Sequence, residues 1–323
     1  MVQANFKYEL VGDVMEPKVV QKFYVGSTYV YALQLDENDN TKVIFTKGRI
    51  PTDGSKVVTM TEKMTLTNFG HSQTLEYYKD PIDGQDYFWV AMNNKSEPAG
   101  KNGDHWATQI GKIQFKAGTT LDYTQAQRLT SLTSANSTGT APFAIARTDA
   151  ALSSTPTSSR TDGGKQRLMI MTSNVVDTSG KYQLSAYNVD TINAKLHASS
   201  TGTVSCKDLT GNLVSSYVTN NSTLKIPNGS WQGLEFADDN SVYFSGGHTG
   251  AVQTIVKGDW RFSKKSSITL STSASDAAEN LDTPASQIET EGIQLKGNEV
   301  LVGLEIHKNA HPHRIYSVSK SSL

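Results

Sequence analysis

The 323-residue sequence has a single cysteine, Cys206, so it can form no internal disulfide and cannot supply a cysteine-rich zinc cluster. Its apolar stretches are short and interrupted, which excludes a membrane-spanning segment. An excess of one charge is also missing, because 30 Lys and Arg residues face 31 Asp and Glu residues and leave a formal net charge of −1. Proteins that grip nucleic acid or an anionic membrane need a local positive excess, so neither partner is expected.

Charged residues (19%) and hydrophobic residues (37%) are both somewhat low, and Ser, Thr, Asn and Gly make up the difference. Such a composition suits a β-rich extracellular protein better than a helical cytosolic enzyme. The first residues lack the long apolar core of a signal peptide. We therefore expect a secreted or cell-wall-associated protein that leaves the cell by another route or whose signal has been removed.

Strand signals dominate what is present. Aromatic and β-branched residues between turn formers predict strands over 29–35, 86–92, 167–172, 241–245 and 300–304. Helical signals are few: Asp190 could cap a short helix over 190–196, and a weaker one is predicted over 276–280. The sequence therefore predicts an all-β fold.

A short pattern recurs along the chain: a polar or aromatic residue, a small residue, an aliphatic residue, often Gln or Glu, and often an apolar residue. Its copies lie at 31–35, 73–77, 143–147, 232–236 and 291–295. Five units of roughly 65 residues suit a five-bladed β-propeller, where a small residue avoids a clash between converging innermost strands. Residues 3–14 could pair with the last blade and close a single domain over 1–323.

Paired β-sandwich domains are the alternative, because regularly spaced strands and turns suit that architecture too. The stretch from 130 to 161 is dense in Ser and Thr and could pass for a linker between two such domains. Because it contains the weakest copy of the repeat, we interpret it as loops around a blade.

Several segments resemble the helveticin J-like proteins, large heat-labile bacteriocins of lactobacilli. They are 25–35, 70–76, 187–196, 231–233, 239–243 and 291–295, of which 187–196 is the most specific. The resemblance runs collinearly from about residue 19 to the end and is weakest over 130–165. It implies an exported protein that acts at the surface of related Gram-positive cells, as an antibacterial or as a coat of the producer's wall. It implies no catalytic residues.

Amides and carboxylates recur at two positions of the repeat, which are Gln73, Gln232 and Glu291, and then Glu76, Glu235 and Gln294. In a propeller, one set would face the axis, where it could hydrogen-bond sugar hydroxyls or hold a cation; otherwise the groups satisfy neighbouring backbone atoms. Glu76, Glu235 and Glu291 are also the candidate acids of a glycan hydrolase, although amides replace carboxylates at equivalent positions.

Two tryptophans beside turns, Trp106 and Trp231, could stack on sugar rings or pack at an edge, whereas Trp89 lies within a strand and is expected in the core. The segment containing His307, His311 and His313 could ligate a metal, but its Asn-Ala-His-Pro sequence favours a solvated hairpin loop. We predict no metal and no other cofactor.

The sequence thus predicts a non-enzymatic, bacteriocin-like protein that binds a glycan or protein of the bacterial cell wall or surface layer. Its candidate ligand-binding residues are Gln73, Glu76, Trp106, Trp231, Gln232, Glu235 and Glu291. A glycan hydrolase and a surface-layer protein that does not kill remain the alternatives. Cys206 lies in no Cys-His motif and is expected to be a buried or idle thiol.

Overall fold

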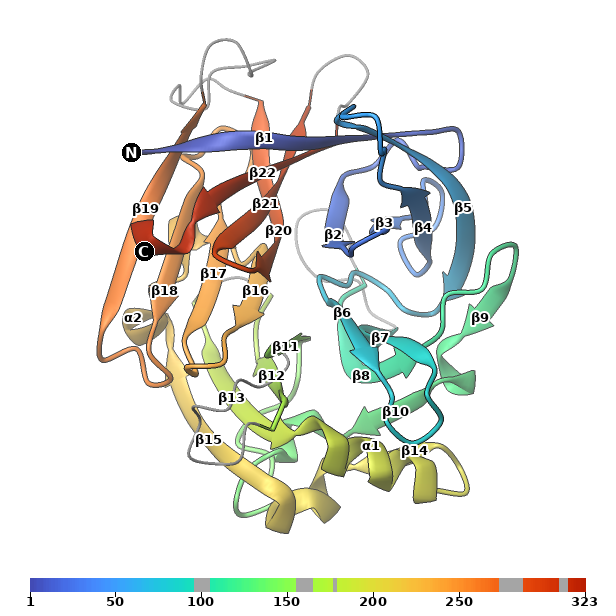
Figure 1. The fold of residues 1–323 in the computed structure, drawn as a ribbon. Coiled ribbons are helices and arrows are strands. Elements are labelled where there is room, and N and C mark those ends of the chain that lie inside the picture. Colours follow the sequence, from blue (N-terminus) through green and yellow to red (C-terminus); the bar gives the residue numbers. More distant parts are fainter. Residues whose placement is uncertain (96–104, 155–164, 177–178, 273–286, 308–312) are drawn as a thin grey trace.

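Five four-stranded antiparallel sheets follow one another along the chain (Figure 1). The computed structural model describes residues 1–95, 105–154, 165–176, 179–272, 287–307 and 313–323. Helices are few and short, so the predicted all-β fold class is confirmed.

The sheets are numbered in chain order. Sheet 1 consists of β2 (Val20–Val25), β3 (Tyr29–Leu35), β4 (Val43–Arg49) and β5 (Val57–Thr67). Sheet 2 consists of β6 (Leu75–Lys79), β7 (Asp86–Asn94), β8 (Ala107–Ile113) and β10 (Gln127–Thr130). Sheet 3 consists of β11 (Arg147–Leu152), β12 (Arg167–Ser173), β13 (Lys181–Asn188) and β15 (Leu213–Asn220). Sheet 4 consists of β16 (Gly233–Phe236), β17 (Val242–Gly246), β18 (Thr254–Gly258) and β19 (Lys265–Thr272). Sheet 5 consists of β20 (Ile288–Lys296), β21 (Glu299–Ile306), β22 (His313–Ser319) and the N-terminal β1 (Val2–Val11).

Strand β1 connects three sheets. It pairs in parallel with β19 through Val2–Ala4, antiparallel with β22 through Asn5–Leu10, and in parallel with β5 through Glu9–Val11. Sheets 4, 5 and 1 therefore form one mixed, thirteen-stranded sheet that also includes β9 (Thr120–Asp122), a parallel neighbour of β5. A second short strand, β14 (Thr203–Ser205), pairs in parallel with β10.

The first strands of the five sheets meet at the centre of the molecule (Figure 1). Strand β2 contacts β6, β6 contacts β11, β11 contacts β16, β16 contacts β20, and β20 contacts β2, which closes the order. Gly233 and Gly292 lie on two of these strands, where an added Cβ would come within 2.8 Å of Ile293 N and 2.9 Å of Gln21 O. Only glycine permits this approach of neighbouring backbones.

Two copies of the repeat do not mark first strands, so the expectation that every copy lies on an innermost strand is wrong for these two. Ala32 lies on β3, the second strand of sheet 1, and Ala144 precedes β11. Ala32 is fully buried, so packing within the core explains its small size equally well. Strand β11 itself lies inside the Ser- and Thr-rich stretch, which contributes the first strand of sheet 3.

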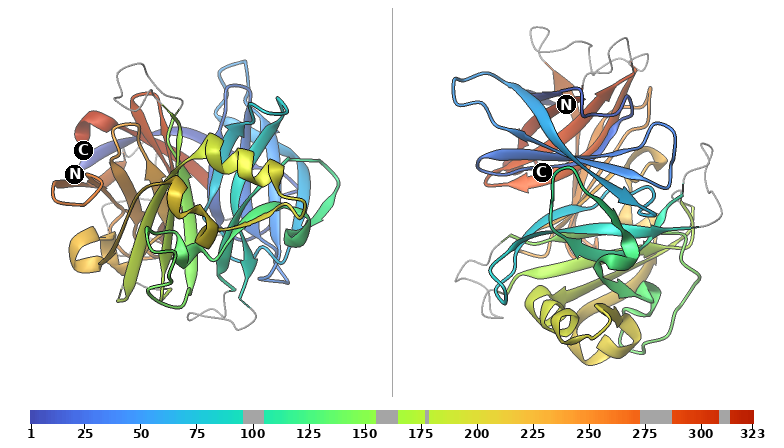
Figure 2. Two further views of the ribbon diagram at one scale, coloured as in Figure 1. Left: turned by 90° about the horizontal axis from the view of Figure 1, so that it is seen from below. Right: turned by 90° about the vertical axis from the view of Figure 1, so that its right-hand side faces the viewer.

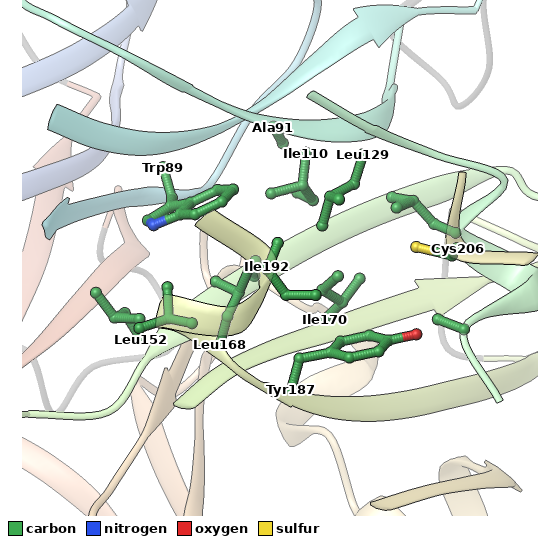
Figure 3. Packing of buried hydrophobic residues seen from close by; sticks show 14 of the residues in the cluster. Trp89, Ala91, Ile110, Leu129, Leu152, Leu168, Ile170, Tyr187, Ile192 and Cys206 are labelled. Atoms are coloured by element: carbon green, nitrogen blue, oxygen red, sulfur yellow. The ribbon is translucent and has the colours of Figure 1, made fainter. Parts of the chain in front are cut away.

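A buried apolar cluster fills each interface between neighbouring sheets. Figure 3 shows the cluster between sheets 2 and 3, in which Trp89 and Ile110 face Leu168 and Ile170. Trp89 is fully buried, as expected, and so is the Cys206 thiol in the same cluster.

Helix α1 (Val189–Ala198) lies at the periphery of sheets 2 and 3 and packs Ile192 into the same cluster (Figure 2). It confirms the helix predicted over 190–196, although its N-cap is Asn188, whose side chain accepts a hydrogen bond from the Asp190 N–H. Helix α2 (Asn221–Leu224) is a single turn. The helix predicted over 276–280 lies outside the described residues.

Candidate functional site at the centre of the sheets

A buried lysine joins two carboxylates at the centre. Lys22 Nζ, from β2, lies 2.7 Å from Glu235 Oε1 on β16 and 3.0 Å from Glu76 Oε1 on β6. Each acid also accepts a backbone N–H with its other oxygen, Glu76 from Leu152 on β11 and Glu235 from Leu295 on β20, both at 3.3 Å. These three side chains, here called the Lys22 cluster, therefore connect all five first strands.

The charges of the Lys22 cluster are unequal, since one ammonium faces two acids. Burial lowers the pKa of Lys22, but Glu235 and Glu76 outweigh that effect, so the net pKa is raised and the ammonium stays charged. Burial raises the pKa of Glu76 well above its ordinary value, and the charge of Glu235 adds to this rise while Lys22 opposes it. Burial and the neighbouring Glu235 thus favour the protonated form of Glu76, whereas Lys22 favours the charged form.

A second cluster surrounds the amide of Gln73, which lies two residues before β6. Gln73 Nε2 donates to Gln232 Oε1 at 2.9 Å and to Glu291 Oε2 at 3.0 Å, and lies 3.3 Å from Gln21 Oε1. Its Oε1 accepts from Arg147 Nη2. Burial raises the pKa of Glu291 well above its ordinary value, reinforced by nearby Glu289 and opposed by Arg147.

The guanidinium of Arg147 lies between two indoles. Its Cζ is 3.9 Å from the ring centre of Trp106 and 4.0 Å from that of Trp231, and the imidazole of His71 stacks on Trp106 with ring centroids 3.8 Å apart. Asp149 pairs with the guanidinium at 3.0 Å. Within the described part of the chain, the indole N–H groups of Trp106 and Trp231 have no hydrogen-bond acceptor.

The hydrogen bonds continue from the buried amide towards solvent. Gln232 Nε2 donates to Glu289 Oε1 at 2.8 Å, and the other oxygen of Glu289 lies 2.9 Å from His307 Nε2. The Glu289 and His307 side chains are 17% and 30% exposed, whereas Gln73 is almost fully buried. The bond to Glu289 raises the pKa of His307 against the effect of burial. We call the half-buried His71, Gln232, Glu289 and His307 the polar rim.

The structure brings all seven predicted residues into these two clusters, which contain Gln73, Glu76, Trp106, Trp231, Gln232, Glu235 and Glu291. The two positions of the repeat lead to different places, since one set meets at Gln73 and the other at Lys22. Gln294 is the exception, because it hydrogen-bonds the backbone N–H and carbonyl of Val25.

Sequence reasoning missed the partners of these residues, namely Gln21, Lys22, Arg147, Asp149 and Glu289. Lys22 carried a signal, as the one charged residue in the segment Val-Gln-Lys-Phe-Tyr-Val of β2. Arg147 and Asp149 are two residues apart on a strand and so share a face, a spacing that favours an ion pair.

Two further groups of ionisable residues bear on metal binding, and the first shares Glu289 and His307 with the polar rim. His307 pairs with Glu289 and His313 with Glu305, while His311 lies outside the described residues. Asp80, Asp83 and His197 lie close enough together to share a metal ion, but the buried Lys112 ammonium contacts the Asp80 carboxylate and neutralises it. In the described ranges no helix has the length and apolar character needed to cross a membrane.

Comparison with known protein families gives a match over almost the whole chain. The family model described as bacteriocin helveticin-J matches residues 1–321. The chain belongs to this family. The resemblance seen in the sequence is thereby confirmed. A search of curated protein sequences found no significant match to this helveticin-J family member.

Two solved structures are similar to this chain, and the first of them shows a related fold. The tail fiber of Staphylococcus aureus phage P68 is 14% identical and superposes with a TM-score of 0.55, covering 98% of this chain and 53% of that chain. An exo-β-1,3-galactanase from Clostridium thermocellum is 9% identical with a TM-score of 0.49, covering 99% of this chain and 62% of that chain. The helveticin-J family chain thus spans between half and two thirds of the length of these structures.

Proposed function

We propose that this helveticin-J family protein is an exported antibacterial protein that binds a surface glycan of related Gram-positive bacteria through the polar rim. The observation that carries the proposal is the continuous set of hydrogen bonds from buried Gln73 to half-buried Gln232, Glu289 and His307. Side chains that are already hydrogen-bonded to buried groups lose little conformational freedom when they bind a ligand. Amides and carboxylates can form hydrogen bonds with sugar hydroxyls.

We further propose that the five sheets are the blades of one five-bladed β-propeller over residues 1–323. Three observations support this arrangement: the closed order of contacts among first strands, an apolar cluster at every interface, and the pairing of β1 with the last strand β22. Paired β-sandwiches would instead concentrate their cores within pairs of facing sheets. In the proposed propeller, the polar rim lies at the end of the axis where first strands begin.

The central acids have a structural role in this proposal, and the protein is not a hydrolase. A glycan hydrolase places two carboxyl groups against the sugar, one on each side of the bond to be cleaved. The side chains of Glu76 and Glu235 are only 9% and 4% exposed, and Lys22 and backbone N–H groups occupy both oxygens of each. Glu291 is 2% exposed and bonded to Gln73.

Sedimentation with isolated walls of a related lactobacillus tests the rim. Gln232→Ala and Glu289→Ala should each weaken wall binding about tenfold, since loss of one ligand hydrogen bond costs about 1.4 kcal/mol. The matched controls Gln3→Ala and Glu37→Ala, at exposed positions on other parts of the molecule, should bind like the parent protein.

The same variants should lose growth inhibition in parallel with binding. Folded rim variants that bind walls as tightly as the controls would contradict the proposed site. Binding by the parent protein without growth inhibition would identify a coat protein and contradict the antibacterial role.

A further inference from the structure

The outer edges of the five sheets differ in whether another strand pairs with them. Strand β5 pairs on its outer edge with β9 and β1, β10 pairs with β14, and β19 pairs with β1, which itself links to β5. In the residues that the structure describes, β15 pairs with β13 alone, so the outer edge of sheet 3 has no strand beside it. This edge lies at the outside of the molecule (Figure 1).

The sequence of β15 lacks the usual protection of an open edge. Its eight residues, Leu-Val-Ser-Ser-Tyr-Val-Thr-Asn, include no charge and no proline, the two devices that most often prevent strand addition. Val214 and Val218 are 44% and 48% exposed, and both lie on the outward face with Ser216. An uncharged edge of about 27 Å, at about 3.4 Å per residue, is a template for another strand.

We propose that a second copy of this chain pairs with this edge, forming a two-fold dimer through antiparallel β15 strands centred on Ser216. In that register, Val214 faces Val218 of the partner subunit, and Val218 faces Val214 of the partner subunit. The two exposed valines thus become cross-strand apolar pairs, and no like charges meet because the strand has none. A two-fold interface requires such self-complementarity, which this strand provides.

Two double variants test the pairing and its register together by sedimentation equilibrium of the full-length protein. V214K/V218K places lysine opposite lysine in both pairs and should weaken the dimer at least about 100-fold. V214E/V218K changes the same two positions but places glutamate opposite lysine, so its dissociation constant should stay within about tenfold of the parent value. V252K, an exposed valine outside β15, serves as the control and should leave the dimer unchanged.

Ser216→Cys tests the centre of symmetry. Directly opposed residues of antiparallel strands have Cα atoms about 4.5–5.5 Å apart, within the range that a disulfide spans. With an added oxidant that accepts two electrons and two protons per bond, S216C should form a disulfide-linked dimer, whereas T52C, at an exposed site in the loop between β4 and β5, should not. The native Cys206 is buried and does not compete.

A parent protein that stays monomeric throughout the concentration range would overturn the inference. So would a dimer that survives V214K/V218K, or a monomer whose β15 edge binds an extended peptide of another protein. None of these measurements involves a wall or a glycan, so their outcome is independent of the proposed function.

Discussion

Replacing Lys22 by methionine removes one ammonium from the centre of the molecule and leaves the side chain almost the same length. Glu235 and Glu76, whose oxygens lie 2.7 Å and 3.0 Å from Nζ, would then be two buried acids without a counter-charge. Breaking a buried ion pair in this way costs about 3–5 kcal/mol. Since domains of this kind have total stabilities of about 5–15 kcal/mol, we expect a free energy of unfolding reduced by about a fifth or more.

A triple variant separates the missing charge from the altered shape. K22M/E76Q/E235Q removes both acids while keeping an acceptor oxygen for the N–H groups of Leu152 and Leu295. Replacing a whole buried ion cluster by neutral groups is often close to neutral in stability, so the triple variant should regain most of the loss, to within about 1.5 kcal/mol of the parent.

The pH dependence of the free energy of unfolding of K22M tests whether buried charge causes the loss. Lys22 opposes the rise that burial causes in the pKa of Glu76, so removing Lys22 raises that pKa further. A carboxyl whose pKa is raised in the folded state stabilises the protein fully below the unfolded pKa of about 4.3, and this stability is lost as pH rises from there to the folded pKa. The deficit of K22M should therefore be smaller near pH 5 than at pH 8.

Denaturant unfolding followed by tryptophan fluorescence measures all of these free energies. A K22M deficit below about 1 kcal/mol would refute the reasoning, as would equal deficits at pH 5 and pH 8 or a triple variant no more stable than K22M.

Two further predictions concern other buried charges. Burial raises the pKa of Glu291, so the parent protein loses stability as pH rises from the unfolded pKa towards the raised folded one; E291Q lacks this loss and should match or exceed the parent in denaturant unfolding at pH 8. A greater deficit of E291Q at pH 8 than at pH 5 would contradict this sign. Lys112→Met leaves the fully buried Asp80 without its ammonium and should cost about 3 kcal/mol, most of which K112M/D80N should regain. Equal losses in the single and double variants would show that charge is not the cause.

The strands were predictable because aromatic and β-branched residues between turn formers favour an extended backbone. The segment 29–35 begins with two tyrosines on either side of a valine, continues with two leucines, and forms β3 with the same bounds. Gly233 and Gly292 were correctly placed on central strands, because a close approach of two backbones requires a glycine at the point of contact.

The repeat did not identify the first strands of sheets 1 and 3, and the reason is physical. The acids of β6, β16 and β20 resemble one another, and a search for similar residues finds them. Their cations, Lys22 on β2 and Arg147 on β11, are complementary rather than similar, so the first strands that carry them do not match the pattern. A search for a lone buried-looking cation in an apolar strand would have found Lys22.

The most direct test of glycan binding without hydrolysis combines two readings on one sample. Isolated walls of a related lactobacillus are incubated with the protein, and both sedimentation of the protein and release of reducing sugar are followed. Sedimentation without sugar release, weakened in Q232A, is the predicted result. Sugar release that disappears in E235Q would contradict it, because Glu235 would then act on the glycan instead of holding Lys22.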